Sequence, residues 1–126
     1  MSLSHVWTLS FKRNPESATA DTDTITGSSE ANVDETLAIG TNVQVNLAID
    51  VSALKSLYIK ASTACTIKTN SSGSPDDTLV LTAGQVISWH NLMSADNPLT
   101  VDVTKIYVTN AAQCALKIYA LQDATP

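Results

Sequence analysis

Apolar and polar residues alternate with a period of two in many short stretches of this chain, and this pattern constrains the fold more than any other feature. Successive side chains of a β-strand point to opposite faces, so such alternation is typical of strands with one buried face. From residue 37 onward the stretches recur between turn-forming sequences such as Asn70–Asp77 and Asn97-Pro98, and no convincing helical period is present. The sequence therefore predicts an all-β domain, an antiparallel β-sandwich or jelly roll of about eight to nine strands.

The apolar faces of these strands form the predicted core. A chain of 126 residues suits a single domain over 1–126 and can bury one hydrophobic core without a metal or a disulfide. Cys65 and Cys114 lie in apolar alternating stretches, which predicts buried free thiols. The residues expected to face inward are Val43, Val45, Leu47, Ile49, Leu57, Ile59, Leu79, Leu81, Val101, Val103, Ile106, Val108, Leu116 and Ile118.

The N-terminal part has a different character. Residues 3–12 alternate and predict a half-buried strand with Leu3, His5, Trp7, Leu9 and Phe11 on one face. Residues 14–36 then hold half of the twelve acidic residues and no basic residue. A segment so poor in apolar residues buries too little surface to offset its ordering entropy. The sequence therefore predicts an extended acidic arm or long loop over 14–36.

An ordered arm of this composition needs a partner outside its own segment. We expect the arm and the strand before it, with Trp7, to contact a neighbouring subunit. Ile25 and Val33 are the expected apolar anchors. The carboxylates, among them Glu16, Asp21 and Asp23, are expected to meet a basic surface or to remain solvated.

Charge and hydropathy exclude some classes of partner. The formal net charge is −5, and the seven basic residues are spread along the chain, whereas nucleic-acid binding needs clustered Lys and Arg. No apolar run reaches the roughly 18–20 residues of a membrane-spanning helix, and the first residues lack the features of a secretory signal. We therefore expect neither a nucleic-acid nor a membrane partner, and synthesis in the cytoplasm.

Residues that could support catalysis are sparse. His5 and His90 are the only histidines, and neither has a metal-ligating neighbour at close spacing. Ser, His and Asp are all present, so composition does not exclude a Ser-His-Asp triad. The sequence nevertheless contains no Gly-x-Ser-x-Gly elbow and no phosphate-binding loop. We expect no catalytic, metal-binding or cofactor-binding residues.

Trp7 and Trp89 are the most informative large side chains. Exposed aromatic side chains serve as stacking platforms in carbohydrate-binding β-sandwiches, but such proteins usually carry several of them. The chain has six aromatic residues in all, so packing in the core or at its rim is the favoured interpretation. A surface cleft that held both tryptophans would instead favour glycan binding.

The stretch Asn70-SSGSPDDTLVLTAGQVISWH-Asn91, followed by Asn97-PLTVDVTKIYVT-Asn110, resembles small β-rich virion proteins of tailed bacteriophages. The resemblance covers residues 60–121, leaves the acidic arm outside, and rests on turn-and-strand patterns that carry no binding residue over. It implies a non-enzymatic virion structural protein, with a capsid decoration (cement) protein that bridges capsid subunits as the first hypothesis.

The partners that the resemblance implies are the major capsid protein or other virion subunits, together with further copies of the chain in a homo-oligomer. Its implied location is the virion, after synthesis in the host cytoplasm. The alternative is a receptor- or glycan-binding module of a phage tail or fibre. A small enzyme is the third and least favoured hypothesis.

Overall fold

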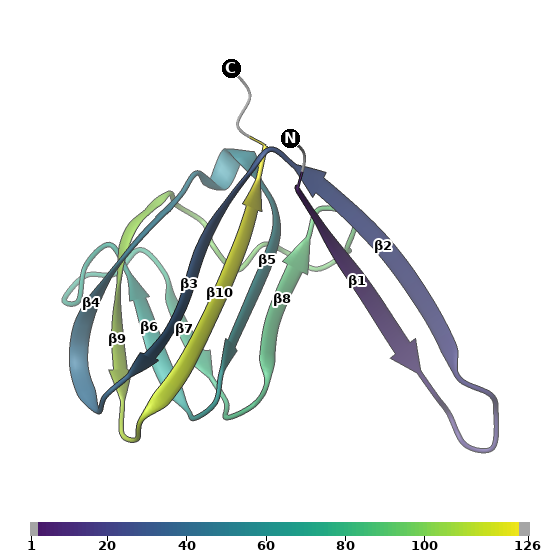
Figure 1. Cartoon of the computed structure of the whole chain (residues 1–126), viewed down its shortest axis with the longest axis horizontal. Coiled ribbons are helices and arrows are strands. Elements are labelled where there is room, and N and C mark those ends of the chain that lie inside the picture. Colours follow the sequence, from purple (N-terminus) through teal and green to yellow (C-terminus); the bar gives the residue numbers. More distant parts are fainter. Residues whose placement is uncertain (1–2, 124–126) are drawn as a thin grey trace.

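The computed structural model describes residues 3–123, and the regular structure in that range is β apart from one short 3-10 turn (Figure 1). The alternating stretches of the sequence form strands, as predicted. The elements are β1 (Leu3–Phe11), β2 (Thr19–Gly27), β3 (Ser29–Leu37), β4 (Gly40–Ile49), η1 (Val51–Ala53), β5 (Leu54–Ala61), β6 (Cys65–Thr69), β7 (Thr78–Leu81), β8 (Val86–His90), β9 (Val103–Asn110) and β10 (Cys114–Gln122).

Eight of these strands form a sandwich of two four-stranded antiparallel sheets, β3-β10-β5-β8 and β4-β9-β6-β7. The first strand of the sandwich pairs with the last, β4 with β9, β5 with β8 and β6 with β7. The four strands β3 to β6 thus pair in reverse order with the four strands β7 to β10, and the resulting pairs wrap around one core. This is the topology of a jelly roll. The predicted all-β sandwich or jelly roll is confirmed.

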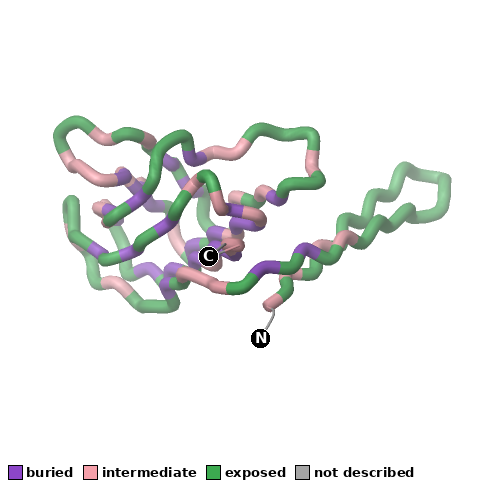
Figure 2. The backbone as a smooth tube through the Cα atoms, turned by 90° about the horizontal axis from the view of Figure 1, so that it is seen from above, coloured by how far each residue is buried: buried purple, intermediate pink, exposed green. Residues whose placement is uncertain are grey.

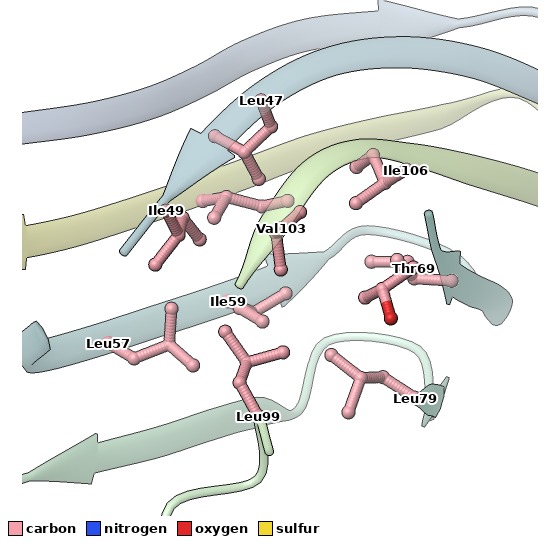
Figure 3. A pocket seen from close by; sticks show the side chains of 11 residues that line it. Leu47, Ile49, Leu57, Ile59, Thr69, Leu79, Leu99, Val103 and Ile106 are labelled. Atoms are coloured by element: carbon pink, nitrogen blue, oxygen red, sulfur yellow. The ribbon is translucent and has the colours of Figure 1, made fainter. Parts of the chain in front are cut away.

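The core lies between the two sheets and is formed by the inward-facing residues of each strand. Leu57, Ile59, Leu116 and Ile118 are almost completely buried, which confirms their predicted orientation. The packing leaves a cavity of only about 10 Å³, around which Figure 3 shows side chains from both sheets. Such a volume is at the lower limit for one water molecule, so the sandwich has a tightly packed interior.

Two residues of the predicted core are exposed instead, Val43 at 41% and Val101 at 45%. Val43 follows Asn42, whose φ is +50°, and an irregularity in the register between β4 and β9 re-aims this end of the strand. Val101 precedes the first residue of β9 and lies in a loop. Periodicity does not hold across a bulge or beyond the end of a strand, which explains both errors.

Cys65 and Cys114 are buried free cysteines, as predicted. They belong to different sheets, since Cys65 begins β6 and Cys114 begins β10. Burial, together with the neighbouring Cys114, raises the pKa of the Cys65 thiol to about 12. The Cys65 thiol is therefore held in its neutral form near neutral pH.

An extended N-terminal arm is present, but it is a β-hairpin of β1 and β2 that spans residues 3–27 rather than a loop over 14–36 (Figure 1). Figure 2 shows it projecting from the sandwich, with most of its outer half exposed. The expectation of a long loop over 14–36 is wrong for residues 19–27 and 29–36, which lie in the strands β2 and β3. β1 supplies the partner for β2, and β10, far along the chain, supplies the partner for β3. A local estimate of buried surface could not include those distant partners.

Candidate functional site

A groove of about 1040 Å³ lies between the hairpin and the outer face of the β3-β10-β5-β8 sheet; we call it the hairpin groove. The hairpin forms one wall, and β5, β8, β10 and the turn after β8 form the other. Its lining residues are His5, Val6, Trp7, Thr8, Leu9, Asp21 and Asp23 from the hairpin, and Tyr58, Val86, Ser88, His90, Leu92, Met93, Ser94, Lys117 and Tyr119 from the sandwich.

A hydrogen-bonded cluster fixes the base of the hairpin to the sheet. Ser56 Oγ on β5 lies 2.7 Å from His5 Nδ1, and it also accepts a hydrogen bond of 2.7 Å from Trp7 Nε1. His5 Nε2 lies 2.6 Å from Glu30 Oε2 at the start of β3. Each polar side chain of this cluster thus has a hydrogen-bonding partner within the cluster. Three strands, β1, β3 and β5, are thereby joined at one point.

The Ser56, His5 and Glu30 side chains follow one another as in a hydrolase triad, but their placement differs from what nucleophilic catalysis requires. Ser56 is fully buried, at 0% exposure, beneath the side chains of the hairpin. A substrate carbonyl must reach the nucleophilic oxygen, and the hydroxyl of Ser56 is already engaged by the indole of Trp7. The geometry of this cluster suits anchoring of the hairpin.

Apolar packing and a close backbone approach complete the anchor. Ile25 on β2 and Leu121 on β10 are buried, at 4% and 0% exposure. A Cβ atom on Gly27 would lie 2.6 Å from the carbonyl oxygen of Gln122 and 2.9 Å from Leu121 Cγ. Ser28 N donates to the same Gln122 oxygen at 3.0 Å. Glycine is thus required where the end of β2 meets β10.

The wall of the groove beside this anchor is rich in aromatic rings. The Trp7 ring lies 6.2 Å from that of Tyr58 and 5.6 Å from the imidazole of His90, and Tyr58 stacks on Tyr119 at 5.8 Å. These centroid distances are within the range in which ring pairs attract one another. Asp23 Oδ2 lies 3.8 Å from His90 Nε2, so β2 also reaches the end of β8. Aromatic rings and carboxylates therefore lie side by side in this part of the groove.

The outer half of the hairpin is free of the sandwich. Leu9 is 72% exposed and Phe11 is 66% exposed, although both continue the face on which Trp7 is half-buried. Val6, on the opposite face, is 62% exposed. Large apolar side chains are thus concentrated on one projecting strand. Their exposure was not foreseen, because alternation identifies a face without showing how far along the strand it is covered.

The residues predicted to form an interface are separated by the structure. Trp7, Asp21 and Asp23 line the hairpin groove. Glu16 lies in the exposed loop at the hairpin tip, where it pairs with Arg13.

The two expected anchors face the interior of this chain. Val33 is buried in the sandwich core at 4% exposure, and Ile25 lies under the hairpin base. Their role as anchors on a neighbouring subunit is wrong, because both side chains are already enclosed here.

Trp89 packs against the edge of the core, and its Nε1 donates to the carbonyl oxygen of Ala95 at 3.1 Å. The favoured interpretation of rim packing is confirmed for Trp89. The hairpin groove holds Trp7 and not Trp89, so it is not a cleft lined by both tryptophans.

The range 3–123 contains no helix of the length and apolarity needed to cross a membrane. Over the same residues, no three His, Cys, Asp or Glu side chains gather closely enough to hold a metal ion. Comparisons of the chain with family models, with curated proteins and with solved structures each found no match.

Proposed function

We propose that this chain is a non-enzymatic structural protein of a phage virion, a capsid decoration protein that contacts neighbouring subunits through its projecting hairpin. The observation that carries the proposal is the exposure of Leu9 and Phe11, at 72% and 66%, on the free half of a hairpin whose base is fixed. Exposed apolar side chains grouped on a projection are typical of a protein–protein contact. The resemblance of residues 60–121 to phage virion proteins supplies the class of particle.

The fold supports this role mechanically. The jelly roll is a rigid base, and the cluster of Ser56, His5, Glu30 and Trp7 holds the hairpin at a defined angle to it. A contact element that is ordered before binding loses less conformational entropy on association than a flexible arm does. The hairpin thus presents Leu9 and Phe11 in a fixed geometry to the adjoining surface.

The charge distribution supports a basic partner surface. Asp21 and Asp23 lie on β2, Glu16 is paired with Arg13 in the tip loop beside Lys12, and the whole chain carries −5. Complementary charge at such a contact increases the rate of association and fixes its register more than it raises affinity. We propose that the major capsid protein or another virion subunit provides this surface.

The test replaces both apolar tip residues, Leu9→Ser with Phe11→Ser, and measures occupancy on particles stripped of the protein. We expect binding to weaken at least tenfold, or about 1.4 kcal/mol. The matched control is Ile39→Ser with Val80→Ser, which removes two residues of the sandwich that are 69% and 72% exposed. Wild-type occupancy by the tip variant would refute the hairpin as the attachment element.

A second candidate, a receptor- or glycan-binding module of a phage tail or fibre, is favoured by one observation. The hairpin groove places the rings of Trp7, Tyr58 and Tyr119 beside Asp21 and Asp23. Aromatic faces and carboxylates together can stack on a sugar and accept its hydroxyl hydrogen bonds. Tyr119→Ala should then abolish binding to host-surface polysaccharide and leave particle occupancy unchanged.

A further inference from the structure

The strand β1 has one edge paired with β2 and, among the described residues, no strand on its other edge. A two-stranded hairpin is marginally stable in water unless a further strand or a packed face supports it. Here the base is packed on the sandwich, whereas residues 8–11 and the β2 residues opposite them are exposed. The outer half of β1 therefore offers an unpaired edge over a part of the hairpin that lacks support.

The two edges of the hairpin differ in how well they are protected against pairing. β1 contains no Lys, Arg, Asp or Glu over its nine residues, LSHVWTLSF, whereas β2 carries Asp21 and Asp23. Charged side chains are a common device for keeping an edge strand from pairing with another chain. All three exposed large apolar residues of the hairpin, Val6, Leu9 and Phe11, lie on β1. The charged residues of β2 thus disfavour pairing of its edge with another strand, whereas β1 has no such protection.

Space for a further strand lies directly beside β1. Side chains from both of its faces line the hairpin groove, Val6 and Thr8 from one face and Trp7 and Leu9 from the other. A cavity that reaches both faces of a strand must run past the free edge of that strand. The groove of about 1040 Å³ lies beside this strand, and an added strand would sit about 4.8 Å from β1.

We infer that the strand that pairs with this edge is β1 of a second copy of the chain. The two strands run antiparallel about a two-fold axis and form a four-stranded sheet in the order β2-β1-β1-β2. This inference rests on the proposed role of the hairpin as the assembly element and names its first partner. An isologous contact requires a surface that complements itself, and an uncharged strand with apolar residues at both ends meets that requirement.

Electrostatics favour this pairing over the other self-pairings of the hairpin. Each copy carries −5, so contact between copies has to keep the hairpin carboxylates apart. In the order β2-β1-β1-β2, Asp21 and Asp23 lie on the outermost strands, about 14 Å from those of the second copy, or three strand spacings. That separation exceeds the Debye length of about 8 Å at physiological salt, so the repulsion is largely screened. Pairing through β2 would instead place these carboxylates on adjacent strands.

The same arrangement serves attachment to a particle. Pairing through the backbone edge leaves the side chains of Leu9 and Phe11 on the surface of the new sheet. If odd-numbered residues lie opposite odd-numbered residues, both copies present these side chains on the same face. The dimer then offers a doubled apolar platform, and two-point attachment raises the apparent affinity for a repetitive surface.

Val6→Lys tests the pairing, because it adds a charge to the open edge at a residue that is 62% exposed in the single chain. The matched control is Thr24→Lys, since Thr24 is the partner of Val6 in the hairpin and is also exposed, but lies on the β2 edge. Analytical ultracentrifugation of the full chain should show wild type and Thr24→Lys at twice 13.3 kDa. For Val6→Lys we expect the dimer dissociation constant to rise at least tenfold, because a charged side chain on an edge strand disfavours its pairing with another strand.

Amide hydrogen exchange supplies a readout that does not depend on mass. The free-edge amides of β1 should become protected as the concentration of wild-type protein rises, and those of β2 that face outward should not. A wild-type chain that remains monomeric at every concentration, or a dimer that Val6→Lys leaves intact, would overturn the self-pairing. Neither result would contradict the proposed function. That function is tested separately, by the occupancy on particles of the variant that carries Leu9→Ser and Phe11→Ser.

Discussion

Trp7 donates a hydrogen bond from its indole Nε1 to the hydroxyl of Ser56 at 2.7 Å, and this contact joins the projecting hairpin to the outer face of the sandwich. The partners are 49 residues apart in sequence. Ser56 is fully buried and also contacts His5, so one small hydroxyl serves two side chains of β1. Ser56 thus contributes two of the polar contacts that position the hairpin.

Removal of the Ser56 hydroxyl should destabilise the protein. Ser56→Ala leaves Trp7 Nε1 and His5 Nδ1 without their buried partner, which we expect to cost about 1–3 kcal/mol. Urea unfolding followed by tryptophan fluorescence measures the change. Ser88→Ala is the control, because Ser88 is exposed on β8 and faces the same groove. Equal stability of the two variants would contradict the anchoring role.

Gly27 should tolerate no side chain. A Cβ atom there would lie 2.6 Å from the carbonyl oxygen of Gln122, and backbone cannot move aside as a flexible side chain can. We expect Gly27→Ala to lower the free energy of unfolding by about 1–3 kcal/mol. Gly73→Ala adds a Cβ that meets nothing within 4 Å and should change stability by less than about 0.5 kcal/mol. Thermal unfolding of both variants checks the difference.

The core and the exposed valine on its border should respond differently to truncation. Ile59 is 2% exposed, and Ile59→Ala should cost about 2–5 kcal/mol because it removes buried methyl groups and leaves a cavity. Val101 belongs to the same apolar pattern in the sequence but is 45% exposed, so Val101→Ala should cost less than about 1 kcal/mol. Denaturant unfolding measures the free energy of unfolding of both variants. An equally large decrease for Val101→Ala would show that Val101 is part of the core.

Cys65 should make stability depend on alkaline pH. Its pKa is raised to about 12 in the folded chain, mainly by burial, against an ordinary value of 9.0. Above pH 9 the unfolded chain loses this proton and the folded chain keeps it, so the free energy of unfolding should fall as pH rises from 9 to 12. Cys65→Ala should flatten that part of the pH profile.

The thiols should be masked at neutral pH as well. Both cysteines are buried, so a thiol reagent at pH 8 should react with neither in the native protein and with both after denaturation. Rapid reaction of the native protein would show that the region around β6 and β10 opens.

The local alternation of apolar and polar residues was sufficient to predict the strands and most of the core residues. Leu116 and Ile118 alternate with exposed residues on β10, and side-chain direction in a strand depends only on position along it. The turn over residues 70–77 and the burial of Cys65 were likewise readable from composition and periodicity. These properties require no knowledge of which strand lies next to which.

Strand pairing was decided by the tertiary structure. Val33 stands in a segment too acidic to order itself, yet it is in the core because β3 pairs with β10, where Ile118 lies opposite it. The hydrogen bonds and buried surface of that pairing come from residues 85 positions away along the chain. A judgement made from residues 14–36 alone could not include them.

The candidate site depends on the tertiary structure most of all. Trp7 and Leu9 lie two residues apart on one face of β1, and sequence alone assigns them the same environment. The structure half-buries Trp7 against Ser56 and leaves Leu9 72% exposed. The sequence determined that the two side chains share a face, because alternation is a local property of the strand. Only the angle at which the hairpin leaves the sandwich decided which of them packs on this chain and which remains free for another, because that angle is set by contacts with β5 and β10.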